Sequence, residues 1–291
     1  MTAIDFDHLR GWIGRSETQR DTIALAPAVA LAATLDHQRV PTTGDALPSP
    51  WHWIYFTPRA RQSELGADGH PKLGGFMPPI PLPRRMWAGG RLRFEDSLLI
   101  GDEVERTTEI IGIDGKQGRQ GPLLFVTLRH LLSTARGLAI EEEQDLVYRA
   151  SSASGGAAPA KANDAPALPP AQWRDEIVPE PPLLFRYSAL TFNAHRIHYD
   201  LPYAQEEEGY PGLVVQGPLT ATLLADRLLA HIVGRITSFE FRGRSPLFAG
   251  APVRLCGQPG DTPGAYALWA EAPDGAAAMT ANATLEAADA D

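Results

Sequence analysis

The chain has 291 residues, of which 44% are hydrophobic and 21% charged, so it can bury the core of one large domain or of two ordinary ones. Its formal net charge of -9 argues against nucleic acid and anionic membranes as partners, because both select basic surfaces. The single cysteine, Cys256, excludes an internal disulfide and lies in an apolar run typical of a buried, inert thiol.

The chain also shows no segment that would direct it to a membrane or out of the cell. No uninterrupted apolar run approaches the roughly 18 residues of a membrane span. Residues 1–7 show no basic segment followed by an apolar core, as a secretory signal would. We therefore expect a cytoplasmic protein, with a homodimer as a possible assembly.

The first part of the chain predicts a helix, a long insertion and a hairpin. Residues 23–35 form an apolar run that predicts a buried helix. Residues 38–91 are rich in Pro, Trp and Arg, which predicts an insertion of ordered but irregular structure over a groove. Residues 123–133 and 138–149 flank a turn at 134–137, which is the pattern of an antiparallel pair of strands.

The insertion ends in a basic and aromatic stretch, residues 83–91, which predicts a glycine-ended loop. Its residues Arg84, Arg85 and Trp87 suit a substrate carboxylate, or the phosphates and adenine ring of a nucleotide. A solvated surface with cation–π contacts is the alternative interpretation.

A linker is predicted over residues 151–171, which are rich in Ala, Pro, Ser and Gly and offer little to bury. It divides the chain into a first half, residues 1–150, and a second half, residues 172–291. The halves resemble each other weakly, because both contain an apolar helix followed by strands.

In the second half, residues 218–232 predict another buried helix, with Pro218 at the favoured first position. Residues 266–272 and 276–285 predict an antiparallel hairpin. One apolar helix and one antiparallel sheet bury each other best when the sheet wraps around the helix. The predicted fold class is therefore α+β, with two antiparallel sheets each wrapped around a central buried helix.

The most informative stretch is residues 191–200, TFNAHRIHYD, which places Asn193 and His198 five positions apart. Residues 210–218, YPGLVVQGP, follow and open into the second helix. A side-chain amide, an imidazole and a helix N-terminus are the groups needed to add water across a polarised double bond.

Each group has an expected role in that reaction. His198 is the candidate general acid and base, because the pKa of an imidazole lies near working pH. Asn193 cannot act as a base, but its amide can orient the attacking water. The backbone N–H of Gly217, at the start of a helix, is the candidate donor to the negative charge that develops on a thioester oxygen.

Other interpretations of these residues remain open. A buried, hydrogen-bonded histidine is the ordinary explanation of His198 taken alone. His195 and His198 form H-x-x-H, but without a spaced third ligand we expect no metal site, and we place His195 beside the substrate. Further substrate-binding candidates follow on both sides of the motif: Arg196, Tyr203, Tyr210 and Gln216.

Residues 192–200 and 210–218 together resemble the MaoC-like hot-dog hydratases and dehydratases. The motif of that family runs Gly-Asp-x-Asn-Pro-(Leu/Ile)-His, and its aspartate and histidine form the catalytic pair. Asn193 stands at the position of the aspartate and His198 at that of the histidine. The loss of the aspartate puts a mechanism with two bases in doubt.

An asparagine at this position is also a mark of one double-hot-dog branch of that family, and this chain resembles that branch. The branch includes mesaconyl-C4-CoA (3-methylfumaryl-CoA) hydratases, itaconyl-CoA hydratases and type 2 hydroxyacyl-thioester dehydratases. Residues 12–15, 82–90 and 246–250 also look like this branch. The resemblance implies a double hot-dog fold, a catalytic second hot dog, a first hot dog that shapes the acyl tunnel, and no cofactor besides the coenzyme A of the substrate.

We therefore expect reversible hydration of a 2-enoyl-CoA, most simply mesaconyl-C4-CoA or itaconyl-CoA giving citramalyl-CoA. A free carboxylate on the acyl group needs a nearby cation, for which Arg84, Arg85 and Arg196 are the candidates. The alternatives are a 3-hydroxyacyl-thioester dehydratase of fatty-acid metabolism, with a long apolar tunnel, and a non-catalytic acyl-CoA binding module.

Overall fold

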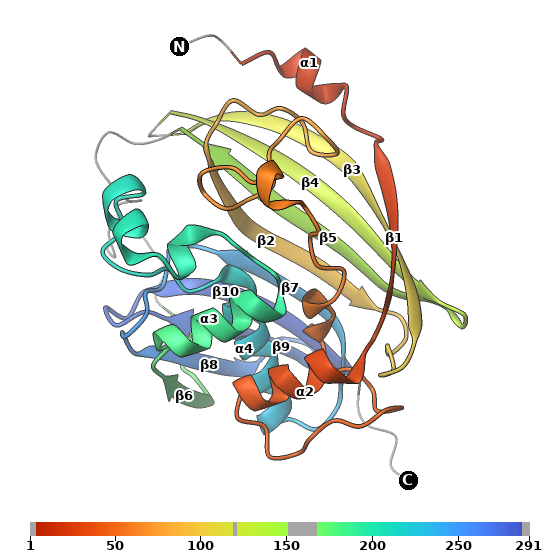
Figure 1. Ribbon diagram of the computed structural model, residues 1–291. Helices are drawn as coiled ribbons and strands as arrows, with labels where there is room; N and C mark the ends of the chain where they lie inside the picture. The colour runs from red at the N-terminus through yellow and green to blue at the C-terminus, as the bar shows by residue number, and fades with distance from the viewer. Residues whose placement is uncertain (1–3, 119–120, 151–167, 287–291) are drawn as a thin grey trace.

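The computed structural model describes residues 4–118, 121–150 and 168–286, and within them one antiparallel sheet of ten strands runs through the molecule (Figure 1). The strands lie in the order β1-β3-β4-β5-β2-β7-β10-β9-β8-β6, so five come from each half. Their bounds are β1 Ser16–Thr22, β2 Arg84–Phe94, β3 Glu103–Gly118, β4 Gly121–Thr134, β5 Gly137–Arg149, β6 Trp173–Ile177, β7 Arg235–Gly243, β8 Val253–Pro259, β9 Ala265–Glu271 and β10 Ala277–Glu286. Both predicted hairpins are confirmed as β4–β5 and β9–β10.

Strands β2 and β7 join the two halves, and this junction corrects the loop predicted over residues 83–91. Strand β2 begins at Arg84, so the irregular insertion ends at Pro83 rather than at residue 91. A Cβ atom on Gly89 would lie 2.5 Å from the carbonyl oxygen of Phe241 in β7. The glycines that predicted a loop therefore allow two strands to approach each other closely.

In the second half the sheet surrounds helix α4 (Gly217–His231), as predicted. Nine residues of α4 are buried, and the helix packs against β7, β8, β9 and β10. Helix α3 (Pro181–Leu190) lies beside it, with the hydroxyl of Tyr187 3.5 Å from that of Thr222 in α4, and no helix was predicted there.

In the first half the helix lies elsewhere. Helix α2 (Leu25–Thr34) packs mainly on α3 and on the 3-10 turn η1 (Trp51–Ile54), beyond the end of its own sheet (Figure 1). The predicted α+β double hot dog is confirmed, but only the second helix occupies the middle of its half of the sheet.

The insertion is ordered and irregular, as predicted, and it lies over the first-half strands (Figure 1). The remaining short elements are α1 Phe6–Arg10, η2 Gln62–Glu64, η4 Arg196–His198 and the π-helical turn η5 Tyr203–Glu207. The linker predicted over residues 151–171 falls mostly on 151–167, which lie outside the described residues.

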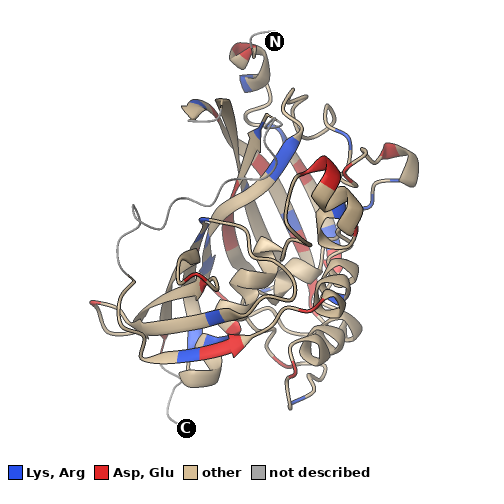
Figure 2. Cartoon of the chain, turned by 90° about the vertical axis from the view of Figure 1, so that its left-hand side faces the viewer, with Lys and Arg blue, Asp and Glu red and all other residues tan. Residues whose placement is uncertain are grey.

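Basic and acidic residues are spread over both halves rather than gathered on one element (Figure 2). Many of the arginines pair with acidic neighbours, as Arg91 does with Asp145 at 2.8 Å and Arg136 with Asp102 at 2.8 Å. Among the described residues, no helix is long and apolar enough to cross a membrane.

Candidate active site

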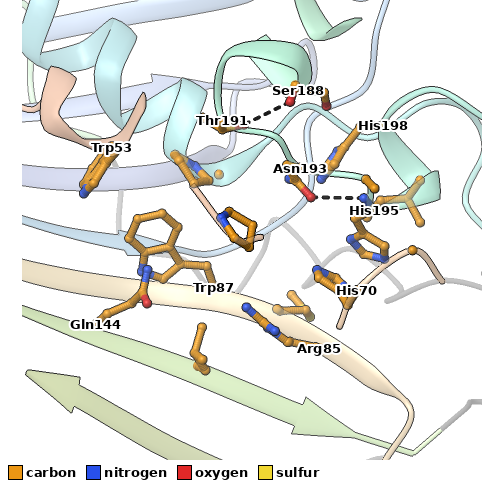
Figure 3. A pocket seen from close by; sticks show the side chains of 18 of the residues that line it. Trp53, His70, Arg85, Trp87, Gln144, Ser188, Thr191, Asn193, His195 and His198 are labelled. Atoms are coloured by element: carbon orange, nitrogen blue, oxygen red, sulfur yellow. Dashed lines mark hydrogen bonds between the residues drawn. The ribbon is translucent and has the colours of Figure 1, made fainter. Parts of the chain in front are cut away.

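A cavity of about 1410 Å³ is lined by residues of both halves. The first half contributes strands β3, β4 and β5 and the insertion, and the second half contributes the end of α3, the residues around His198 and the start of α4. Figure 3 shows Asn193, His195 and His198 on one side of this space, with Arg85, Trp87 and Gln144 on the side formed by the first-half strands.

The end of α3 positions Asn193. Thr191 caps the helix, with its hydroxyl donating to the carbonyl oxygen of Tyr187 at 2.8 Å, and Phe192 takes a φ of +49°. The backbone N–H of Asn193 then donates to the carbonyl oxygen of Ser188 at 2.8 Å. The chain is thereby turned so that the side chain of Asn193 faces the cavity.

The side-chain amide of Asn193 has a defined orientation. Its Oδ1 accepts the backbone N–H of His195 at 3.0 Å. The Nδ2 group is therefore the half of the amide that is left to donate toward the cavity. A donor here can hold the oxygen of a water, which supports the role expected of this residue.

His198 is a buried base with an assigned tautomer. Its Nδ1 lies 2.7 Å from the carbonyl oxygen of Val214, which can only accept, so Nδ1 carries the proton. Burial lowers the pKa of His198 to about 4, so the ring is neutral near pH 7. The lone pair of Nε2 is then left to take a proton, and Figure 3 shows the ring next to Asn193.

Helix α4 begins at Gly217, on the wall of the same cavity. The first N–H groups of a helix have no partner within it, and the helix dipole makes this end attractive to negative charge. A Cβ atom on Gly217 would meet only the carbonyl oxygen of Trp87, at 3.9 Å. The glycine therefore leaves room for a ligand to approach the helix N-terminus.

The structure adds two residues that sequence analysis missed, Asp68 and His70 of the insertion. The ring of His70 lies 4.1 Å from that of His195, and the ring of His195 lies 5.3 Å from that of His198 (centroid distances). Asp68 holds His70, because its Oδ2 accepts from Nδ1 at 2.9 Å. The only local signal was an Asp-Gly turn that precedes a histidine.

Gly69 allows this turn to dock on the loop around His195. Its φ is +90°, and a Cβ atom on it would lie 1.8 Å from the carbonyl oxygen of Ala194. The backbone N–H of Arg196 also donates to the carbonyl oxygen of Asp68 at 2.9 Å. The insertion thus forms part of the site rather than only a cover.

Three of these residues also have the composition of a metal site. Asp68, His70 and His195 bring one ligand atom each within 4.8 Å of one another. Of the H-x-x-H pair only His195 belongs to this group, and the other two candidate ligands come from the first half, where no sequence pattern pointed to them. The expectation that no metal is bound stays a prediction.

The other predicted substrate-binding residues divide into two groups. Arg84, Arg85, Trp87, His195 and Tyr210 line the cavity. By contrast, Arg196, Tyr203 and Gln216 are not among its lining residues.

The residues outside the cavity lining have structural partners instead. Arg196 pairs with Asp200 at 2.8 Å, and its guanidinium lies over the ring of Tyr203 at 4.1 Å. Gln216 donates to the carbonyl oxygen of Leu184 at 2.8 Å and to the hydroxyl of Ser188 at 2.9 Å. Gln216 therefore ties α3 to the start of α4, which explains its burial without a contact to substrate.

The first-half wall of the cavity contains a buried polar network. Glu142 is 3% exposed and accepts from His52 at 2.9 Å and from Trp53 at 3.0 Å. The partnership with His52 holds the pKa of Glu142 below its ordinary value although burial opposes this. The first-half wall of the cavity is therefore not purely apolar, as the tunnel expected for a long acyl chain would be.

Comparison with known proteins identifies the family. The family model for hydroxyacyl-thioester dehydratase type 2 matches residues 50–249. The chain belongs to this family. It is therefore an enzyme of the hydro-lyase type.

Two curated relatives of this family member cover most of its length. The mesaconyl-C(4)-CoA hydratase of Chloroflexus aurantiacus is 52% identical over 278 residues, which are 94% of this chain and 96% of that protein. The mitochondrial hydroxyacyl-thioester dehydratase type 2 of Schizosaccharomyces pombe is 31% identical over 270 residues, which are 81% of this chain and 88% of that protein.

The fold is shared with a solved MaoC-like dehydratase from Phytophthora capsici. The TM-score is 0.66, the sequence identity is 15%, and the match covers 98% of this chain and 100% of that chain. At this identity the likeness concerns the fold alone, and it agrees with the double hot dog described above.

Proposed function

We propose that this enzyme reversibly hydrates a small, branched, dicarboxylic 2-enoyl-CoA, with mesaconyl-C4-CoA giving citramalyl-CoA as the preferred reaction and itaconyl-CoA as a related substrate. The relative with 52% identity over nearly the whole chain supports this substrate class. The observation that carries the chemistry is the hydrogen bond from Nδ1 of His198 to the carbonyl oxygen of Val214, because it leaves Nε2 as a base beside Asn193.

The proposed reaction follows from these groups. Asn193 donates from Nδ2 to a water, and His198 takes a proton at Nε2 as the water oxygen bonds to the β-carbon. The electrons of the double bond move to the thioester oxygen, where the N–H of Gly217 meets the negative charge. The imidazolium then returns the proton to the α-carbon. One base is sufficient in this scheme, which accommodates the asparagine at position 193.

We also propose that the reaction needs no cofactor besides the coenzyme A of its substrate, since water, an imidazole and a helix N-terminus supply every step. Dialysis against a chelator should leave turnover unchanged. A loss of activity that zinc or another divalent ion restores would contradict this proposal. A cytoplasmic location and a homodimer stay predictions of the sequence.

A dehydratase acting on longer 3-hydroxyacyl thioesters is the second candidate. The relative with 31% identity and the volume of the cavity favour it. The buried pair of His52 and Glu142 opposes it, because it makes part of the first-half wall polar, and a polar wall suits a long alkyl chain less well than an apolar one.

A panel of thioesters tests the proposal. Loss of enoyl absorbance should be fastest with mesaconyl-C4-CoA, slower with crotonyl-CoA and slowest with a ten-carbon 2-enoyl-CoA. A preference for the ten-carbon substrate would favour the second candidate. Binding of coenzyme A thioesters without any change in enoyl absorbance would mean that the chain is a binding module.

A further inference from the structure

The arginines that line the cavity differ in their partners. Arg84 pairs through Nε with Glu208 at 3.1 Å, and both side chains are nearly buried. Arg106 donates to Oε1 of Gln19 at 2.8 Å, and Arg149 donates to the hydroxyl of Tyr210 at 3.3 Å.

Arg85 is different. In the part of the chain that the structure describes, its guanidinium has neither an ion pair within 4.0 Å nor a hydrogen bond. Its side chain is half-buried on strand β2, in the wall of the cavity, and Figure 3 shows it on the same side of the site as His70. A permanently charged, partly desolvated group of this kind is stabilised by an anion.

The acid next to His70 does not supply that anion. Both oxygens of Asp68 are used by His70, with Oδ1 accepting its backbone N–H at 3.0 Å and Oδ2 accepting Nδ1–H at 2.9 Å. The charge of Arg85 contributes to the lowered pKa of His70 and of His195, where burial is the largest cause. Arg85 therefore stands beside this corner as a cation whose charge no carboxylate of the described residues pairs with.

The corner lies close to the reacting atoms. The ring of His195 is 5.3 Å from the ring of His198, and the ring of His70 lies 4.1 Å from that of His195, tilted by 42°. In mesaconyl-C4-CoA the free carboxylate is attached to the β-carbon that water attacks, about 1.5 Å from it. A carboxylate placed there points away from the thioester and toward one side wall of the site.

We propose that Arg85 binds the free carboxylate of the acyl group, in a subsite whose wall is formed by His70 and His195. This assignment rests on the proposed hydration of a dicarboxylic acyl-CoA and selects one of the three arginines that the sequence left open. Arg84 is paired with Glu208, and Arg196 is paired with Asp200 outside the cavity lining. The planar guanidinium can pair with both carboxylate oxygens.

The subsite makes the enzyme selective for acyl groups with a carboxylate on the β-carbon. The matched probe is 3-methylcrotonyl-CoA, in which a methyl group replaces that carboxylate. Both thioesters are assayed for kcat/KM with the wild type, with Arg85→Gln and Arg85→Lys, and with Arg196→Gln as a charge-removal control outside the cavity lining.

We expect Arg85→Gln to lower kcat/KM for mesaconyl-C4-CoA on the order of 100-fold, because it removes one partner of a desolvated charge pair. The ratio of kcat/KM for mesaconyl-C4-CoA to kcat/KM for 3-methylcrotonyl-CoA should fall nearly as much. Arg85→Lys should recover part of the ratio, because it keeps the charge but not the bidentate geometry. Arg196→Gln should leave the ratio unchanged. If Arg85→Gln does not fold, Arg85→Lys becomes the test variant, and its ratio of kcat/KM values for the two substrates should be about 10-fold below that of the wild type.

The outcomes separate this assignment from the proposed function. An equal loss on both substrates, or an unchanged ratio, would overturn the role of Arg85 while leaving hydration intact. A wild type that hydrates 3-methylcrotonyl-CoA but not mesaconyl-C4-CoA would overturn the dicarboxylic substrate itself. Stoichiometric zinc in the purified enzyme, measured by mass spectrometry and lost together with activity on chelation, would assign the corner of Asp68, His70 and His195 to a metal and overturn the carboxylate subsite.

Discussion

The two halves of the sheet cover their inner faces in different ways. In the second half, α4 fills the space with apolar residues, and nine of its fifteen residues are buried. In the first half, α2 packs on α3 and η1 instead, and strands β3, β4 and β5 line a cavity of about 1410 Å³. The two half-sheets are therefore covered differently: the half with the filled sheet carries the proposed catalytic groups, and the half without a central helix lines the cavity that we propose for the acyl group.

This division explains why polar groups are buried in the first half. A sheet face that is not covered by an apolar helix needs other partners. Here the partners are the insertion, the aromatic residues of η1 and the network around Glu142. The following changes would break or sharpen the comparison between the halves.

The largest effect is expected for His198→Ala. Removal of the base should lower kcat by about 10³–10⁴-fold, in the upper range for general acid–base catalysis. Affinity for coenzyme A thioesters should change little, as measured by calorimetry, because the acyl cavity extends into the first half. Turnover near that of the wild type would remove His198 from the mechanism.

A smaller loss is expected for Gly217→Ala. The added methyl group meets no protein atom closer than 3.9 Å, so the variant should fold with an unchanged melting temperature. It should lower kcat about 10–100-fold, by displacing the thioester oxygen from the helix N-terminus. The control is Gly212→Ala, whose added methyl group meets no atom within 4 Å and which should keep full activity. Gly250→Ala is not a suitable control, because the φ of Gly250 is +79° and side chains rarely adopt that conformation. Unchanged kinetics in Gly217→Ala would argue against the oxyanion role.

A change in the first half should affect stability more than catalysis. Glu142→Ala removes the acceptor of His52 and Trp53, and breaking a buried pair of this kind costs about 3 kcal/mol in the free energy of unfolding. Glu142→Gln keeps one acceptor and should lose less. Denaturant unfolding gives the free energies, and kcat on mesaconyl-C4-CoA should fall less than with Gly217→Ala. A collapse of turnover at full stability would mean that the network acts in the chemistry.

The smallest effect concerns pH. The folded pKa of His198 is about 4 because the ring is buried, so the base stays neutral and kcat/KM should be flat from about pH 8 to pH 6. The unfolded histidine binds a proton already near pH 6.5, so the free energy of unfolding should fall as the pH drops from about 6.5 toward 4. Short assays, at pH values where the protein stays folded, separate the pH dependence of kcat/KM from that of the free energy of unfolding. An acid limb centred at pH 6.5 would show that the ring is solvated.

Much of the fold was predictable because its signals are local. The apolar periods of α2 and α4 and the turn residues between β4 and β5 lie within a few positions of the structures they specify. The spacing of Asn193 and His198 likewise predicted two groups that act at one site, and the structure has both in the segment that follows α3. The glycines at 89 and 90 misled because the same residue type serves loops and close strand contacts.

By itself, the sequence determined a helix and strands in each half, the stretch in the second half that we propose as catalytic, and its relation to known hydratases, because these depend on residues that are near one another along the chain. Only the tertiary structure decided that α2 lies beyond the end of its sheet, that Gln216, Tyr203 and Arg196 do not line the cavity, and that Asp68 and His70 join His195 from more than 120 positions away. Such contacts depend on how β2 and β7 join the halves, and no local pattern of residues encodes that junction.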